Sequence, residues 1–168
     1  VGETAARLAE HLGLPPELVN ALRLAGEFHD LGKYDPRFQR WLDPEGRMGG
    51  PLAKSAMGQG RLESARLASG WPRGGRHELL SARVASALLE YHPDLDVDLV
   101  VHLIASHHGQ GRPLVRVVDD RAPTNLVVEV VGQRVRVSAN LETPDWDEPR
   151  RFRALNERYG LWGLALLE

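Results

Sequence analysis

The chain has 168 residues, of which 42% are hydrophobic, and its formal net charge is −2. That length suffices for one domain with its own core, and the nearly balanced charge gives no overall signature of a nucleic-acid-binding protein. The sequence contains no cysteine, which excludes disulfides, thiolate metal ligands and thiol nucleophiles. We find neither an apolar run near the ~20 residues of a membrane span nor a signal peptide, so we expect a cytoplasmic protein without membrane contact.

Helical patterns open the chain. The first covers residues 1–12 and is closed by Gly13, with apolar positions at Val1, Ala5 and Leu8. The second begins at Pro15-Pro16, which suit a first helical turn, and Asp35-Pro36 interrupts it. One more short turn is expected at Phe38, Trp41 and Leu42. Both chain ends run through apolar helical patterns, so we expect residues 1–168 to be one domain from a longer protein.

The middle of the chain changes from loop to helix. Residues 44–76 are rich in Gly, Pro and Ser and are interpreted mostly as loop, with a helical turn near Leu62–Leu67. Strong helices are predicted over residues 77–91 and 97–108, and Gly109 ends the second of them.

In the last third of the chain the spacing of apolar residues changes from a helical to a strand-like pattern. Leu126–Val131 and Arg134–Ala139 alternate as strands do, and Gly132-Gln133 fits a two-residue hairpin turn. A final helix is expected from about Glu148 to the end. The predicted fold class is therefore mainly α, a helical bundle with a β-hairpin insertion near residues 126–139.

A His-Asp pair on the second helix is the first candidate for chemistry. Adjacent helical residues project about 100° apart, so His29 can bind one ion while the Asp30 carboxylate bridges to a second. Lys33 lies one turn later on the same patch, and Gly26 and Gly32 would let another helix approach closely. A buried core histidine or a capping pair is the plainer interpretation of this dipeptide taken alone.

Other histidines occupy helix ends. His107 and His108 straddle the apolar face of their helix, so both could reach one interior site, although helix capping by cationic histidine is the alternative. His77 opens its own helix, where the ring can turn inward. We expect the remaining histidines, which are His11, His92 and His102, to be structural or solvated.

Three helices thus offer histidine, and one of them adds an aspartate. Neutral imidazole with carboxylate suits Mn, Fe, Co, Ni or Zn better than Ca, and Mg can bind through carboxylate and water. Two such ions can generate hydroxide and hold the attacking and leaving oxygens of a phosphodiester. Lys33 would then stabilise charge on the phosphate or protonate a leaving oxygen. These residues predict a metal-dependent phosphodiester hydrolase.

Three stretches carry a family resemblance: FHDLGKYDPRFQ at residues 28–39, RHELLSA at 76–82 and SHHG at 106–109. The first six of these residues resemble the signature of the HD metal-dependent phosphohydrolase superfamily. Together the three stretches resemble one branch of it, the HD nuclease domain of the type I CRISPR-associated helicase–nuclease. The resemblance covers most of residues 1–110 and the final helix around Tyr159–Leu167.

The resemblance implies an HD-type helical bundle that cuts single-stranded DNA, as an endonuclease or exonuclease, in antiviral defence. It implies two divalent metal ions (Mn, Fe, Ni, Co or Mg) with His29, Asp30, His77, His107 and His108 as ligands, and catalytic roles for Lys33 and Asp30. The implied partners are a helicase domain, fused or separate, and an RNA-guided CRISPR surveillance complex. Family members have two further ligands, a first-helix histidine and a last-helix aspartate, which we expect outside residues 1–168.

A basic segment offers a path for the DNA. Its cations are Arg47, Lys54, Arg61, Arg66, Arg73 and Arg76, and its acids are Glu45 and Glu63. We expect this segment to guide the phosphate backbone toward the metals, with Trp71 available for base stacking, and a solvated loop is the alternative. The other tryptophans, Trp41, Trp146 and Trp162, are expected in the core.

Two other functions stay open at this point. One is a nucleotide or cyclic-dinucleotide phosphohydrolase of the same superfamily. The other is a non-catalytic interaction module that kept the helical bundle and lost its metals.

Overall fold

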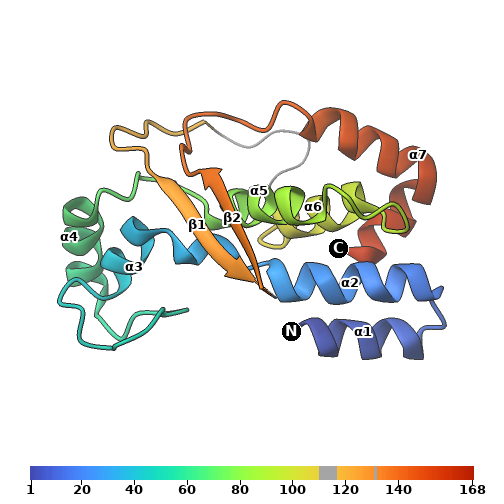
Figure 1. The fold of residues 1–168 in the computed structure, drawn as a ribbon, viewed down its shortest axis with the longest axis horizontal. Helices are drawn as coiled ribbons and strands as arrows, with labels where there is room; N and C mark the ends of the chain where they lie inside the picture. Colours follow the sequence, from blue (N-terminus) through green and yellow to red (C-terminus); the bar gives the residue numbers. More distant parts are fainter. Residues whose placement is uncertain (110–116, 131) are drawn as a thin grey trace.

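A computed structural model describes residues 1–109, 117–130 and 132–168 (Figure 1). The helices are α1 (Gly2–His11), α2 (Pro16–Phe28), the 3₁₀ helix η1 (Leu31–Tyr34), α3 (Pro36–Leu42), α4 (Gln59–Ser69), α5 (His77–Leu89), α6 (Val97–Ser106) and α7 (Glu148–Leu167), and the strands are β1 (Asn125–Val130) and β2 (Gln133–Ser138). The fold is mainly helical with one antiparallel hairpin, as the sequence predicts. Among the helices that the structure describes, none has the length and apolar composition needed to cross a bilayer.

Two apolar cores hold these elements together, and α5 contributes to both. One core joins α2, α5, α6 and α7, and the other joins α3, α5 and the hairpin. Helix α6 is buried from Leu99 to Ser106, as expected for a helix that is apolar on all sides. Figure 1 shows α5 and α6 side by side in the middle of the molecule, with α2 and then α1 below them.

Helix α1 packs through its small residues, and the predicted apolar face is wrong. Val1 and Leu8 are exposed, whereas Gly2 and Ala9 are buried. The reason is the close approach of α1 to α2, where a Cβ added to Gly26 would lie 2.7 Å from the Cα atom of Gly2. Such a short spacing accommodates glycine and alanine and turns the larger side chains outward.

Helix α4 is a full helix of 11 residues, although the sequence predicted a single turn inside a loop. Glycine and serine lower its intrinsic helix propensity, and its apolar positions are too few to give a clear periodic pattern. Contact with α3 stabilises it instead, since the Trp41 indole donates a hydrogen bond to the Leu62 carbonyl at 2.9 Å. Gly70, in the left-handed conformation with φ 77°, ends the helix.

The hairpin is confirmed, with a one-residue shift of the predicted strands. Gln133 pairs with Val130, so it belongs to β2 and not to the turn as predicted. Gly132 keeps its predicted turn position and has a φ of 74°, which favours glycine. The predicted strand end at Val131 lies outside the described residues.

A buried ion-pair network joins the hairpin region to the segment that follows η1. The guanidinium of Arg37 forms ion pairs with Asp35 at 2.9 Å and Asp120 at 2.7 Å. It also donates to the carbonyls of Ala122 and Ala139 at 2.9 and 2.8 Å. All three charged side chains are almost fully buried, so the network is stable only because every charge has a partner.

Helix α7 bends back on itself, which brings its two ends to one imidazole. Its chain direction changes at Gly160, where φ is 72° and ψ is 159° (Figure 1). A straight helix of 20 residues would be ~30 Å long. Nevertheless Glu148 and Glu168 both contact His102 of α6, at 2.8 Å from Nδ1 and 2.6 Å from Nε2.

His102 is therefore a structural histidine that carries a charge. Its side chain is 0% exposed, and each ring nitrogen needs a proton to donate to a carboxylate. Burial alone would lower the pKa of His102, but the hydrogen bonds and charges of Glu148 and Glu168 outweigh it and raise the pKa. Of the two expected states, structural and solvated, the first is confirmed.

We predict that His102→Gln destabilises the protein by about 3–5 kcal/mol, because the uncharged amide removes the buried cation that Glu148 and Glu168 share. Urea unfolding followed by circular dichroism at neutral pH measures the loss. His92 is exposed, so His92→Gln is the matched control and should change the stability by less than about 0.5 kcal/mol. Equal stability of the two variants would contradict the prediction.

Candidate metal centre

All five predicted ligands come together where helix ends meet. His29 follows the last residue of α2, His77 is the first residue of α5, and His107 follows the last residue of α6. The ring centroids of His29 and His107 are 5.2 Å apart, and those of His77 and His108 are also 5.2 Å apart. One ligand nitrogen from each of His77, His107 and His108 lies within 4.8 Å of the other two.

The Asp30 carboxylate lies between two of these imidazoles. Its Oδ1 is 3.2 Å from His77 Nε2, and its Oδ2 is 3.4 Å from His29 Nε2 and 2.8 Å from Lys33 Nζ. Partial burial would raise the pKa of Asp30, but the Lys33 hydrogen bond and the nearby charges outweigh it and lower the pKa. Asp30 is therefore an ionised carboxylate with an oxygen directed to each of two histidines.

Two of the histidines have their tautomer set by the helix that they terminate. His29 Nδ1 is 2.7 Å from the Gly26 carbonyl, and His107 Nδ1 is 2.7 Å from the Ile104 carbonyl. A carbonyl can only accept a hydrogen bond, so Nδ1 carries the proton and Nε2 keeps its lone pair. A residue just beyond a helix end can reach the carbonyl three positions earlier, which explains why histidine follows both helices.

The buried nitrogens fit a divalent cation. Among the described residues, His77 Nε2 and His107 Nε2 are buried without any hydrogen-bond partner, an arrangement that costs free energy unless an ion or water meets them. Burial lowers the pKa of His77 to about 4, although the Glu78 charge opposes this change. Burial also lowers the pKa of His107. Both rings are therefore neutral at physiological pH, which metal ligation requires.

Gly32 brings the two halves of this cluster together. A Cβ added to Gly32 would lie 2.0 Å from the His77 carbonyl oxygen and 2.8 Å from the Ser81 amide nitrogen. The Gly32 amide donates to Ser81 Oγ at 2.8 Å, and Ser81 Oγ donates to the His77 carbonyl at 3.1 Å. The predicted close approach at Gly32, and at Gly26 described above, is confirmed.

The predicted DNA path is wrong in two of its members. Trp71 is only 2% exposed and packs on Phe38 in the core, so its ring cannot stack on a base. Arg66 is buried and bonded to Glu63 and to the Trp71 carbonyl, so it belongs to the scaffold. Conversely, Trp146 and Trp162, predicted in the core, are 76% and 85% exposed. The sequence pattern did not distinguish buried from exposed side chains here, because burial depends on which helix or strand covers each side chain.

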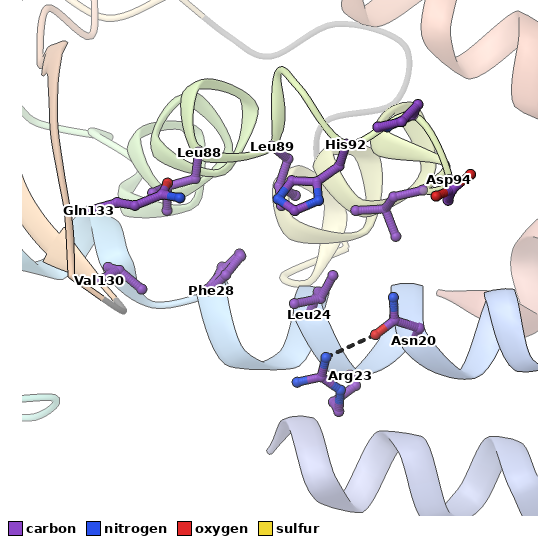
Figure 2. Close-up of a pocket in the computed structure, with 12 residues that line it drawn as sticks. Asn20, Arg23, Leu24, Phe28, Leu88, Leu89, His92, Asp94, Val130 and Gln133 are labelled. Carbon is purple, nitrogen blue, oxygen red and sulfur yellow. Dashed lines mark hydrogen bonds between the residues drawn. The ribbon is translucent and has the colours of Figure 1, made fainter.

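The exposed histidines are as expected, and one lines a separate pocket. His11 and His92 are solvent-exposed. Figure 2 shows His92 at a pocket of about 400 Å³ between α2, the end of α5 and the hairpin. Phe28 lines this pocket, yet its neighbour His29 and the other four predicted ligands do not. The candidate metal centre is thus a cluster of residues at helix ends and does not line this pocket.

Comparison with known proteins agrees with the helical fold. Residues 1–131 match the protein family described as HD domain. The chain belongs to the HD domain family. HD domains are in general metal-dependent phosphohydrolases that bind divalent metals, and the match includes all five predicted ligands and Lys33. No curated protein and no solved structure matches the chain significantly.

Sequence reasoning did not single out two residues that surround the HD-domain cluster. Ser81 links η1 to α5, as described above. Glu78, next to His77, is a buried carboxylate. The spacing His-Glu-x-x-Ser was visible in the sequence, but a polar residue in the first turn of a helix is ordinarily exposed, so the pattern alone carried no signal.

We predict that Gly32→Ala destabilises the protein by at least about 2 kcal/mol and weakens metal binding, because the methyl group must push η1 away from α5. Gly60→Ala is the matched control. Gly60 lies in α4 with nothing within 4 Å of an added Cβ, so alanine there should stabilise the helix by up to ~1 kcal/mol. Thermal unfolding of both variants, with and without Mn²⁺, tests these opposite signs.

We also predict that the pKa values of two buried histidines, His77 and His102, are shifted in opposite directions. At about pH 5, where an ordinary histidine is mostly protonated, the His77 ring should remain neutral and the His102 ring should be charged. The reason is that the pKa of His77 is lowered to about 4 while that of His102 is raised. Long-range ¹H–¹⁵N spectra of the metal-free protein distinguish the two states. A charged His77 ring or a neutral His102 ring at this pH would contradict the assignment.

Proposed function

We propose that this HD domain is a divalent-metal-dependent nuclease that hydrolyses phosphodiester bonds of single-stranded DNA. The observation that carries the proposal is the position of Asp30, whose carboxylate is directed to His29 and His77 and also contacts Lys33. The motifs at residues 28–39, 76–82 and 106–109 support the nuclease branch among HD domains. The same resemblance supports a role in CRISPR antiviral defence, with a helicase domain and an RNA-guided complex as partners.

The ligand set suits two cations. His29, His77 and His107 would offer Nε2, His108 would add a more exposed nitrogen, and Asp30 would contribute its carboxylate oxygens. Divalent ions bound there would supply a hydroxide nucleophile at neutral pH and polarise the phosphate. The protein's contribution is to hold neutral imidazoles and an ionised carboxylate in fixed positions before the substrate arrives.

Lys33 would act on the substrate beside these ligands. Its ammonium is 2.8 Å from Asp30 Oδ2, so it lies at the edge of the cluster. From that position it would bind a phosphate oxygen, stabilise the negative charge that develops there, or donate a proton to the leaving oxygen. The Asp30 contact keeps the long side chain oriented toward the cluster.

The exposure of the cluster favours a polymer substrate. The Asp30 side chain is 34% exposed and His108 is solvent-exposed. A site for a small nucleotide ordinarily buries most of its ligand, whereas a chain that continues in both directions needs an open surface. This openness favours a nucleic-acid strand over a mononucleotide.

The test is Mn²⁺-dependent cleavage of circular single-stranded DNA. Asp30→Asn should reduce the rate at least about 1,000-fold, because it removes the charge shared by the ligand set. Lys33→Met should reduce kcat about 100-fold without weakening Mn²⁺ binding, because the substrate loses its contact with the ammonium group while removal of a cation 2.8 Å from Asp30 does not oppose a metal ion there. Asp147→Asn is the control, since this carboxylate is exposed on the surface.

Nucleotides and cyclic dinucleotides are tested as alternative substrates in the same assay. Intact DNA with hydrolysed small nucleotides would assign the protein to another branch of the superfamily. Absence of any hydrolysis, together with absence of bound Mn²⁺, would identify a non-catalytic interaction module. Cleavage that persists in Asp30→Asn would show that the described cluster is not the catalytic site.

A further inference from the structure

Glu78 has a buried carboxylate that is neither one of the candidate metal ligands nor one of the catalytic residues described above. It is 2% exposed in the first turn of α5. A carboxylate is buried in proteins only when charged or polar partners compensate the loss of water. Its partners therefore indicate what it does.

Glu78 lies between a cation and a metal-ligand candidate. One carboxylate oxygen, Oε1, forms an ion pair with the Arg76 guanidinium. The other, Oε2, is 3.6 Å from His77 Nδ1, which is longer than a hydrogen bond but close enough for the carboxylate charge to attract a proton on Nδ1. On the opposite edge of the same ring, Nε2 faces Asp30 Oδ1 at 3.2 Å. The His77 imidazole is therefore placed between two carboxylates, with Glu78 behind it and Asp30 in front.

His77 also differs from His29 and His107 in how its tautomer can be set. Those two rings follow a helix and use the carbonyl three residues earlier, at 2.7 Å in each case. His77 is the first residue of α5, so the preceding turn of helix that would supply such a carbonyl does not exist. Another acceptor must hold the proton on Nδ1 if Nε2 is to bind a metal.

We propose that Glu78 is the positioning residue of the metal centre, which holds the proton of His77 on Nδ1 and directs Nε2 to the cation. A carboxylate behind a ligating histidine also makes the ring a stronger donor. Arg76 forms an ion pair with Glu78 and so keeps the carboxylate in place. This inference rests on the metal-dependent activity proposed above and adds one residue to the site, outside the ligand set.

The first measurement is the long-range ¹H–¹⁵N spectrum of the metal-free protein, with the His77 signals assigned by His77→Asn. The wild type should show the proton of His77 on Nδ1. In Glu78→Gln, which keeps the size and removes the charge, the amide can donate as well as accept, so the Nε2-protonated form should appear. The second measurement is Mn²⁺ affinity by calorimetry, where the Kd of Glu78→Gln should rise about 10–100-fold.

The matched control is Glu63→Gln. Glu63 is also a helical carboxylate paired with an arginine, Arg66, but it is 62% exposed and lies in α4. This variant should change neither the His77 tautomer nor the Mn²⁺ affinity. A general effect of removing one acidic charge would appear in both variants.

Two results would overturn the inference. One is a Glu78→Gln protein with an unchanged His77 tautomer or a Kd within about twofold of the wild type. The other is a wild-type His77 with its proton on Nε2, which decides the matter even if Glu78→Gln does not fold. Neither readout involves DNA, so failure of the nuclease proposal and failure of this one are distinguishable.

Discussion

The direct contact between the Gly32 backbone and the first turn of α5 is the constraint on which the candidate metal centre depends. At this point even a Cβ atom would lie 2.0 Å from the His77 carbonyl oxygen. The contact places Asp30 and Lys33, which flank Gly32 in the sequence, next to His77 at the start of α5. Helix α6 then supplies His107 and His108, because it packs between α2 and α5 in the same core. The Gly32 contact therefore decides whether Asp30 and Lys33 lie next to His77, while the packing of α6 places His107 and His108.

The site gains its geometry at a cost in stability that the scaffold offsets. Buried imidazole nitrogens without partners destabilise the metal-free protein by about 1–3 kcal/mol each. Two ionic networks stabilise the surrounding elements. The Arg37 network joins the hairpin region to the segment after η1, and the His102 network joins α6 to both ends of α7. In both networks every buried charge is paired, whereas the ligand cluster retains unpaired nitrogens, as expected for a site that binds a cation.

The helix ends themselves supply most of the chemistry. His29 and His107 follow a helix, and the last carbonyls of that helix hold Nδ1–H. His77 begins a helix and has the Glu78 carboxylate behind it instead. With Glu78 acting as we propose, the three rings would have the same ligating tautomer, set in two different ways. HD domains are in general metal-dependent phosphohydrolases, and this chain belongs to that family.

The sequence by itself determined the helical fold class, the hairpin and the set of residues that meet at the cluster. These features depend on local patterns, such as the period of apolar residues, glycine at turns and histidine at helix ends. Only the tertiary structure decided which side chains are covered. Trp71 is buried and Trp146 is exposed, α1 packs through alanine and glycine, and α4 is a full helix. His102 meets carboxylates 46 and 66 positions away. Burial and long-range ion pairing are set by which elements pack together, and no local pattern contains that information.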